Sequence, residues 1–298
     1  LGYAAPRGHA LIDRELYLPK SWTGDPARCE AAGIPGHAAF ATKPQLARLM
    51  IERAVSARVP FAWVAADEAY GDNGPLRTWL EQQHIAYVLA VARDHRVPAG
   101  AGRTVRADAL AARLPRRAWQ QLSAGDGAKG HRWYDWAWVT ISNPGPGHRY
   151  LLIRRNRSTG ELAFYHCYSP QRVTLAALVK DAGLRWTIEE NFQAGKGLTG
   201  LDEHQVRRWT SWYRWVTLAM LGAAVLTIAA AIESARGPDA AGQIPLTRNE
   251  IAHLLATVTA PPGRDAGHRL RWSHWRRRHH HRARTCHYQR QITQDHAT

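Results

Sequence analysis

Cysteine is scarce in this sequence. Cys29, Cys167 and Cys286 are the only three in 298 residues, and no two of them form a C-x-x-C pair. An odd number of widely spaced cysteines excludes a disulfide framework and a zinc knuckle as the basis of the fold. We therefore expect the protein to work in a reducing environment, the cytoplasm.

Acidic residues are outnumbered by basic ones. The sequence has 24 Asp and Glu against 40 Lys and Arg, which gives a formal net charge of +16. This surplus makes a polyanion the first partner to consider, although charge alone names no reaction. A disordered chain is excluded, because hydrophobic residues make up 45% of the sequence and tryptophan occurs 13 times. The length suits one large domain or two ordinary ones.

The first residues lack the features of a secretory leader, since no basic segment precedes an apolar run and a cleavage site. The sequence begins with Leu1 rather than Met. Its opening residues, LGYAA, resemble the end of a strand that is already under way. We expect the sequence to begin inside a longer chain.

Apolar periodicity in the first 95 residues is typical of an α/β domain. The pattern predicts, in order, a strand at 10–18, a helix at 43–57, a buried strand within 61–72, a helix at 75–83 and a strand at 85–92. The stretch between the first strand and the first helix is rich in glycine and proline and is predicted to be a loop. Strands that alternate with helices favour an α/β fold.

Residues 96–175 are β-rich instead. Strands are predicted at 133–141, 149–156 and 161–168, with the turn Ser158-Thr159-Gly160 joining the last two. Helical periodicity then returns. This order predicts a β-rich insertion inside an α/β domain.

An uncharged stretch at residues 216–232 has to be considered as a membrane span. Its 17 residues are at the lower limit of length for crossing a bilayer, and Arg214 and Glu233 flank it. We favour a buried core helix and expect no membrane. Residues 261–298 hold nine arginines and two aspartates, which gives this tail a charge of +7.

Asp67 follows the buried strand directly. A carboxylate at the end of such a strand lies at the rim of a sheet, where substrate clefts of open α/β folds form. The alternative is that Asp67 or Glu68 only caps the next turn.

Arg185, Glu189 and Lys196 are separated by four and seven residues. At about 100° per residue they fall within about 40° of one another on a helix, so one face offers a carboxylate between two cations. Glu190 would point elsewhere. The alternative is an ordinary salt-bridged surface.

The spacing R-x3-E-x6-K is similar to the Tyr-Arg-Glu-Lys signature of the DDE transposases encoded by bacterial insertion sequences. The surrounding RWTIEENFQAGKGLTGLDEHQVRRWTSWYRWVTLAML, the earlier FAWVAADEAYGD and the final RLRWSHWRRRHHHRARTCHYQR also resemble that family. The likeness extends over nearly the whole chain.

The resemblance implies an RNase H-like fold: a mixed sheet with flanking helices, interrupted by a β-rich insertion. The corresponding regions are a first part of the core at 1–95, an insertion at 96–175, a second part of the core at 176–236 and a basic DNA-binding segment at 237–298. The family's first core strand would then lie upstream of Leu1.

The resemblance also implies three carboxylates that hold two Mg2+ or Mn2+ ions, which prefer oxygen ligands. Two such ions activate the attacking oxygen and stabilise the leaving oxygen at a phosphodiester. Asp67 matches the family's second Asp, and Glu189 matches its Glu. These two residues are the expected catalytic and metal-binding residues.

Two positions depart from the family pattern. The signature tyrosine is replaced by Ala182. The first Asp of the family has no evident counterpart, because Asp13 is the only acid in the first predicted strand and is expected to have a surface role.

The expected partner is double-stranded DNA, both transposon ends and target, with a homodimer in the synaptic complex. The residues expected to contact DNA phosphates are Arg185, Lys196, Arg207, Arg208, Arg276, Arg277 and Arg278. The leading hypothesis is metal-dependent cleavage and strand transfer at insertion-sequence ends. The alternatives are a catalytically inactive DNA-binding remnant and an RNase H-like nuclease.

Overall fold

The computed structural model describes residues 1–99, 102–127, 130–142, 145–236 and 245–259, and single positions of the C-terminal segment from Gly267 to Cys286. The chain forms two compact units, Leu1–Pro245 and Leu246–Thr298. Helix α10 (Arg248–Thr259) belongs to the second unit.

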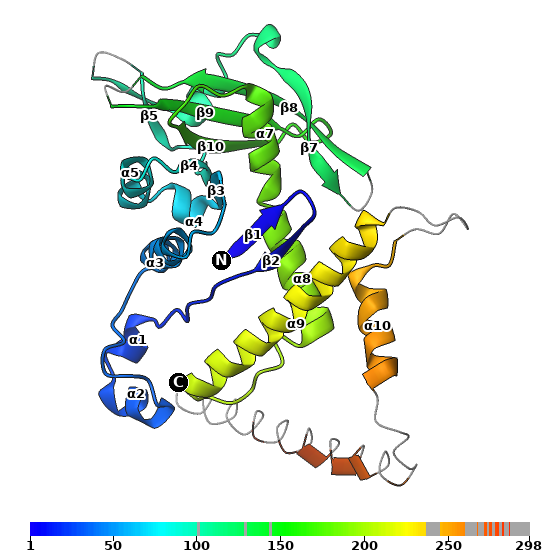
Figure 1. The fold of residues 1–298 in the computed structure, drawn as a ribbon. Helices are drawn as coiled ribbons and strands as arrows, with labels where there is room; N and C mark the ends of the chain where they lie inside the picture. Colours follow the sequence, from blue (N-terminus) through cyan, green and yellow to red (C-terminus); the bar gives the residue numbers. More distant parts are fainter. Residues whose placement is uncertain are drawn as a thin grey trace. The chain divides into compact units, whose positions relative to one another are not determined.

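The first unit is built on a six-stranded mixed sheet (Figure 1). Its strands are β3 (Trp63–Ala66), β4 (Ala86–Val91), β7 (Gln120–Gly127), β8 (Gly130–Thr140), β9 (His148–Arg155) and β10 (Leu162–Ser169). The strand order is β3-β4-β10-β9-β8-β7, with β3 and β4 parallel and the other pairs antiparallel. The predicted mixed α/β sheet is confirmed, and it is compatible with an RNase H-like fold.

Strand β10 lies beside β4, so the β-rich stretch continues the same sheet that the α/β stretch begins. The two strands pair from Phe164 opposite Val91 to Tyr168 opposite Tyr87. The division into four regions stays a prediction.

Alternation along the strands gives the sheet two apolar faces. Val88 packs with Leu178 of α7 (Leu175–Leu184), which covers one face. Leu89 packs with Leu80 of α5 (Gly74–Gln82) on the other face. Also on that second face are α3 (Lys43–Ser56), α6 (Ala107–Ala111) and the small sheet of β5 (Arg96–Pro98) and β6 (Thr104–Arg106). Period-two patterning thus produces a helix–sheet–helix arrangement.

A hairpin and two helices complete the larger elements of the first unit. The hairpin joins β1 (Gly2–Ala5) to β2 (Gly8–Leu11), and it packs against α8 (Thr187–Thr199) and α9 (Trp209–Ala235). The short elements are α1 (Lys20–Thr23), α2 (Pro26–Ala32), α4 (Glu68–Gly71) and a 3-10 turn at Arg116–Ala118.

Two secondary-structure predictions are wrong. The strand predicted at 10–18 ends at Leu11, because Asp13 and Glu15 beyond it form ion pairs with Arg53 instead of joining a strand ladder. The predicted loop after it contains α1 and α2. The signals for α2 are local, since Asp25 caps it and Gly33 ends it at a φ of 67°.

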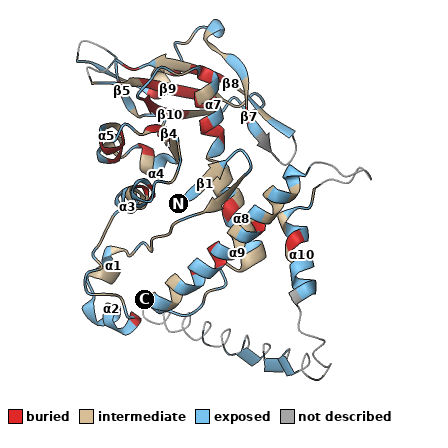
Figure 2. Cartoon of the chain, viewed as in Figure 1, coloured by how far each residue is buried: buried red, intermediate tan, exposed pale blue. Residues whose placement is uncertain are grey.

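The prediction of a buried core helix at 216–232 is also wrong in one respect. The segment is helical, but only Val216, Ala219, Met220 and Leu226 of α9 are buried, and much of its surface is exposed (Figure 2). By length and composition α9 could cross a membrane, and 22% of its most apolar 18-residue window is buried.

Candidate functional site

Asp67 stands where β3 ends and α4 begins. Its side chain is exposed, and Oδ1 accepts a hydrogen bond from the backbone N–H of Ala69 at 3.0 Å. Asp67 is therefore the N-cap of α4. This is the capping role that the sequence offers as the alternative to a substrate site. The cap uses one carboxylate oxygen and leaves the other one at the rim of the sheet.

Gly71 determines how closely α4 approaches the sheet. A Cβ atom on Gly71 would lie 1.8 Å from the carbonyl oxygen of Ala90 in β4. Only glycine permits this contact, which holds the four-residue helix, and with it Asp67, against the end of the strand pair.

A chain of side-chain contacts holds the far end of α4. His95 Nδ1 lies 2.8 Å from Asp72 Oδ1, and His95 Nε2 lies 3.1 Å from Nδ1 of His166 in β10. Burial, with a further contribution from Arg77, lowers the pKa of His166 to about 3. No sequence signal points to this group, because its members are far apart in the chain and meet only in the fold.

Arg185 lies outside the helix that carries Glu189. It is the C-cap residue of α7, and α8 begins at Thr187. The Thr187 hydroxyl donates to the Leu184 carbonyl, and Ile188 and Glu189 donate their backbone N–H groups three residues back instead of four. The predicted continuous helix is therefore interrupted at Arg185 and Trp186, which keep helical backbone angles, and the common face of Arg185 and Glu189 stays a prediction.

Glu189 and Lys196 do lie on one helix, and both are exposed. Helix α8 continues past Gly195 and ends at Gly200, whose φ is 65°. Glu189 in the first turn also suits the positive end of the helix dipole.

His9 of β2 holds the other side of α8. Its Nε2 lies 3.1 Å from a carboxylate oxygen of Glu190, and its Nδ1 lies 2.8 Å from Oδ1 of the buried Asn191. Glu190 is therefore turned toward the hairpin, and Glu189 is not. Sequence reasoning missed His9, although it separated Glu189 from Glu190 correctly.

The structure does not bring Asp67 and Glu189 into one cluster. Helix α4 packs on β3, β4, α3 and α5, whereas α8 packs on β1, β2 and α9. Over the described part of the chain, no group of three or more His, Cys, Asp or Glu side chains could hold a metal ion. Both carboxylates have the right donor chemistry, but these residues alone do not fit a two-metal site.

Asp13 is not the surface residue that the sequence predicts, because its side chain is only 19% exposed. Its Oδ2 receives a hydrogen bond from Arg53 at 2.8 Å, and its Oδ1 accepts from the backbone N–H of Arg14. Both carboxylate oxygens are thus engaged within the fold.

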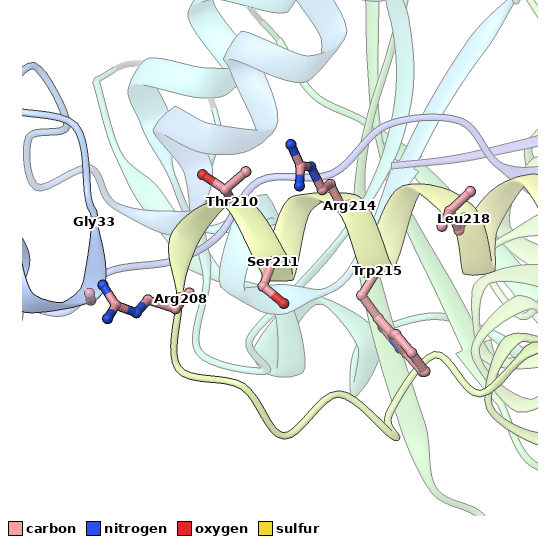
Figure 3. A pocket seen from close by; sticks show the side chains of 8 residues that line it. Gly33, Arg208, Thr210, Ser211, Arg214, Trp215 and Leu218 are labelled. Atoms are coloured by element: carbon pink, nitrogen blue, oxygen red, sulfur yellow. The ribbon is translucent and has the colours of Figure 1, made fainter.

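A basic pocket of about 490 Å3 opens at the start of α9 (Figure 3). It is lined by Ala32, Gly33, Arg208, Thr210, Ser211, Arg214, Trp215 and Leu218. Arg208 extends toward Gly33 at one end, and Leu218 lies at the other. Thr210 and Arg214 point to one side of the helix, and Ser211 and Trp215 point to the opposite side. No acidic residue lines the pocket, and the Trp215 indole N–H donates to the carbonyl of Gly200 at 2.8 Å. The predicted phosphate-contact residue Arg208 is therefore placed in a basic recess.

The other predicted DNA contacts are only partly described. Arg207 is exposed next to the pocket residues in the chain, and Arg278 is exposed in the second unit. Arg276 and Arg277 lie outside the described residues.

Comparison with known families gives one match. Residues 1–138 match the family model described as DDE superfamily endonuclease. The matched range contains β3 and Asp67, whereas α8 and Glu189 lie beyond it. A search of curated proteins finds no match. Somewhat less than half of the chain, from the hairpin into β8, is thus similar to the DDE superfamily endonucleases, and this similarity supports a nuclease that acts on DNA.

Proposed function

We propose that the protein is a DNA transposase that cuts and joins DNA at the ends of an insertion sequence, with Asp67 and Glu189 as two of its catalytic carboxylates. The observation that carries this proposal is the position of Asp67, exposed at the end of β3 within the region similar to the DDE superfamily endonucleases. The spacing of Glu189 and Lys196 on α8 supports the transposase type.

Divalent metal dependence is part of the proposal. Mg2+ and Mn2+ take carboxylate oxygens, and two ions supply charge stabilisation at the scissile phosphate. Asp67 and Glu189 each have an exposed carboxylate to offer, and a third ligand is needed beyond those that the described residues place near them.

The basic residues then bind the substrate backbone. Arg208 and Arg214, with the hydroxyls of Thr210 and Ser211, suit different phosphodiester oxygens, because Thr210 and Arg214 point to one side of α9 and Ser211 to the other. Lys196 on the Glu189 face would contribute a point charge near the cleaved end. None of these contacts reads a base, so sequence recognition would come from elsewhere.

A second function deserves a test of its own: a protein that binds DNA without cutting it. The observation in its favour is that the described residues contain no cluster of three metal-binding side chains. The same basic pocket would serve either function.

The test is a cleavage and joining assay of the full chain on duplexes that carry the element's own ends. With Mg2+ or Mn2+ we expect nicking at the end and joining to a second duplex, and with a chelator neither product. Asp67→Asn and Glu189→Gln should each abolish both products while DNA binding stays within about twofold of wild type, because neither residue carries the positive charge that binds phosphate.

Glu68→Gln is the matched control, since it removes a carboxylate next to Asp67 and should leave cleavage intact. Binding without cleavage under every metal condition would establish the non-cutting protein. Cleavage without joining would indicate a nuclease. Retained cleavage in Asp67→Asn would contradict the assignment of Asp67 as a catalytic residue.

A further inference from the structure

Five large apolar side chains form an exposed line along α9. Their exposed fractions are 67% for Leu218, 58% for Leu221, 49% for Val225, 59% for Ile228 and 56% for Ile232. The spacings of three, four, three and four residues are those of the a and d positions of a heptad. We call these five residues the α9 seam.

The opposite side of α9 is attached to the first unit. Val216, Ala219, Met220 and Leu226 are buried, and α9 packs on β2 and α8. The attachment is close, since a Cβ atom on Gly222 would lie 3.1 Å from Cγ2 of Thr199. A helix that spans a bilayer meets lipid or other helices around its circumference, whereas α9 packs along one side on β2 and on α8, which carries the exposed residues Glu189 and Lys196. The seam therefore lies on the side of α9 that is turned away from β2 and α8.

The residues beside the seam are small and uncharged. Thr217, Ala224, Ala229 and Ala231 occupy flanking e and g positions, whereas Gly222, also at an e position, is already packed against Thr199 of α8. Small residues at these positions let another helix approach closely. No charged residue occurs between Arg214 and Glu233, so two seams would not repel each other despite the chain's net charge of +16.

We propose that the α9 seam pairs with the α9 seam of a second copy of this chain, as a two-helix contact about a twofold axis. A line of a and d residues is complementary to itself, which is what an isologous dimer requires. A homodimer is already expected from the family resemblance; the proposal assigns its contact to α9 and does not depend on the DNA chemistry above.

The area of the seam is at the lower limit of what a dimer needs. Five half-exposed apolar side chains bury about 100 Å2 each, hence about 500 Å2 per copy and about 1,000 Å2 in total. That total is near the lower limit for a specific interface. Two heptads on an isolated peptide would be too short, but packing on β2 and α8 holds α9 helical before it binds, so dimerisation has no folding cost.

The first test is analytical ultracentrifugation of the full chain without DNA, over a wide range of protein concentration. We expect a reversible monomer–dimer equilibrium. Val225→Glu, at the centre of the seam, should weaken the dimer at least about tenfold, because it buries an unpaired carboxylate in the interface.

The matched control is Val55→Glu on α3, the same substitution at a helical valine that is 44% exposed. It should leave the dimer unchanged. Equal weakening by both variants, or a wild-type chain that is monomeric at every concentration, overturns the proposal.

Cross-linking supplies a readout that does not depend on losing a contact. In a chain with Cys29→Ser and Cys286→Ser, Val225→Cys should form a disulfide-linked dimer on oxidation, and Val55→Cys should not.

Binding of a monomeric chain to phosphatidylcholine vesicles, lost in Val225→Glu, would assign the seam to a membrane and overturn the dimer. Because no DNA is present, failure here leaves the cleavage test standing.

Discussion

Gly71 fixes the position of Asp67 through a single missing methyl group. Gly71→Ala would place a Cβ atom 1.8 Å from the carbonyl oxygen of Ala90, and backbone cannot move aside as a flexible side chain can. We expect a loss of about 3 kcal/mol or more in the free energy of unfolding, measured by urea denaturation. DNA cleavage at a temperature where the variant is still folded should also fall, since α4 must shift.

Gly197→Ala is the control for that substitution. A Cβ atom on Gly197 would have no neighbour within 4 Å, and Gly197 lies inside α8. The stability of this variant should stay the same or rise slightly, because alanine favours a helix more than glycine does. If the two variants had equal stability, the close approach of α4 to β4 would be wrong.

Asp181 on α7 is only 8% exposed, and burial raises its pKa to about 6 from an ordinary 3.8. The folded protein thus holds this proton more tightly than the unfolded chain, so stability falls as pH rises from about 4 to about 6 and is constant above. Asp181→Asn should remove that decline and raise the free energy of unfolding at pH 8 by up to about 3 kcal/mol.

The measurement is thermal or urea unfolding at pH 4 and pH 8. Asp202→Asn, at an exposed aspartate, is the control and should change neither value. A stabilisation by Asp181→Asn that is equal at both pH values would contradict a burial effect on ionisation.

Helix α8 is positioned by an element that is distant in sequence, the β1–β2 hairpin. His9→Ala would remove the hydrogen-bond partner of Asn191 Oδ1 and the ion-pair partner of Glu190. The Nδ2 atom of Asn191 already lacks a hydrogen-bond partner. We expect a loss of about 1–3 kcal/mol in unfolding free energy. His37→Ala, at an exposed histidine, should have no measurable effect. Equal unfolding midpoints for the two variants would show that the hairpin does not hold α8.

The elements themselves could be predicted where a signal was local. Apolar periodicity identified α3, α5, β3 and β4 within a few residues, and the Ser158-Thr159-Gly160 turn joins β9 to β10 as expected. The break between α7 and α8 could not be predicted, because no local signal marks it. Just before the break, α7 makes a close contact across the fold: a Cβ atom on Gly183 would lie 2.0 Å from the carbonyl oxygen of Ala124 in β7.

The basic pocket predicts how the whole molecule responds to salt. A variant with both Arg208→Ala and Arg214→Ala should bind duplex DNA more weakly, with the slope of log K against log salt reduced by about two, because two phosphate contacts are lost. Fluorescence anisotropy at several salt concentrations measures the slope. Arg113→Ala, at an exposed arginine, is the control. An unchanged slope in the double variant would remove the pocket from the DNA-binding surface.

The sequence by itself determined the α/β class, the acid at the end of a strand and the helix that carries Glu189, because each depends on local periodicity or on a short motif. The strand before Asp67 is not buried as predicted, since β3 is an edge strand of intermediate burial. The tertiary structure decided three things that no local signal carries. It excluded Arg185 from α8, it made Asp67 a cap held in place by Gly71, and it left one side of α9 exposed. The physical reason is that composition sets how apolar a helix is, whereas packing against partners such as β2 and α8 sets which of its sides is covered.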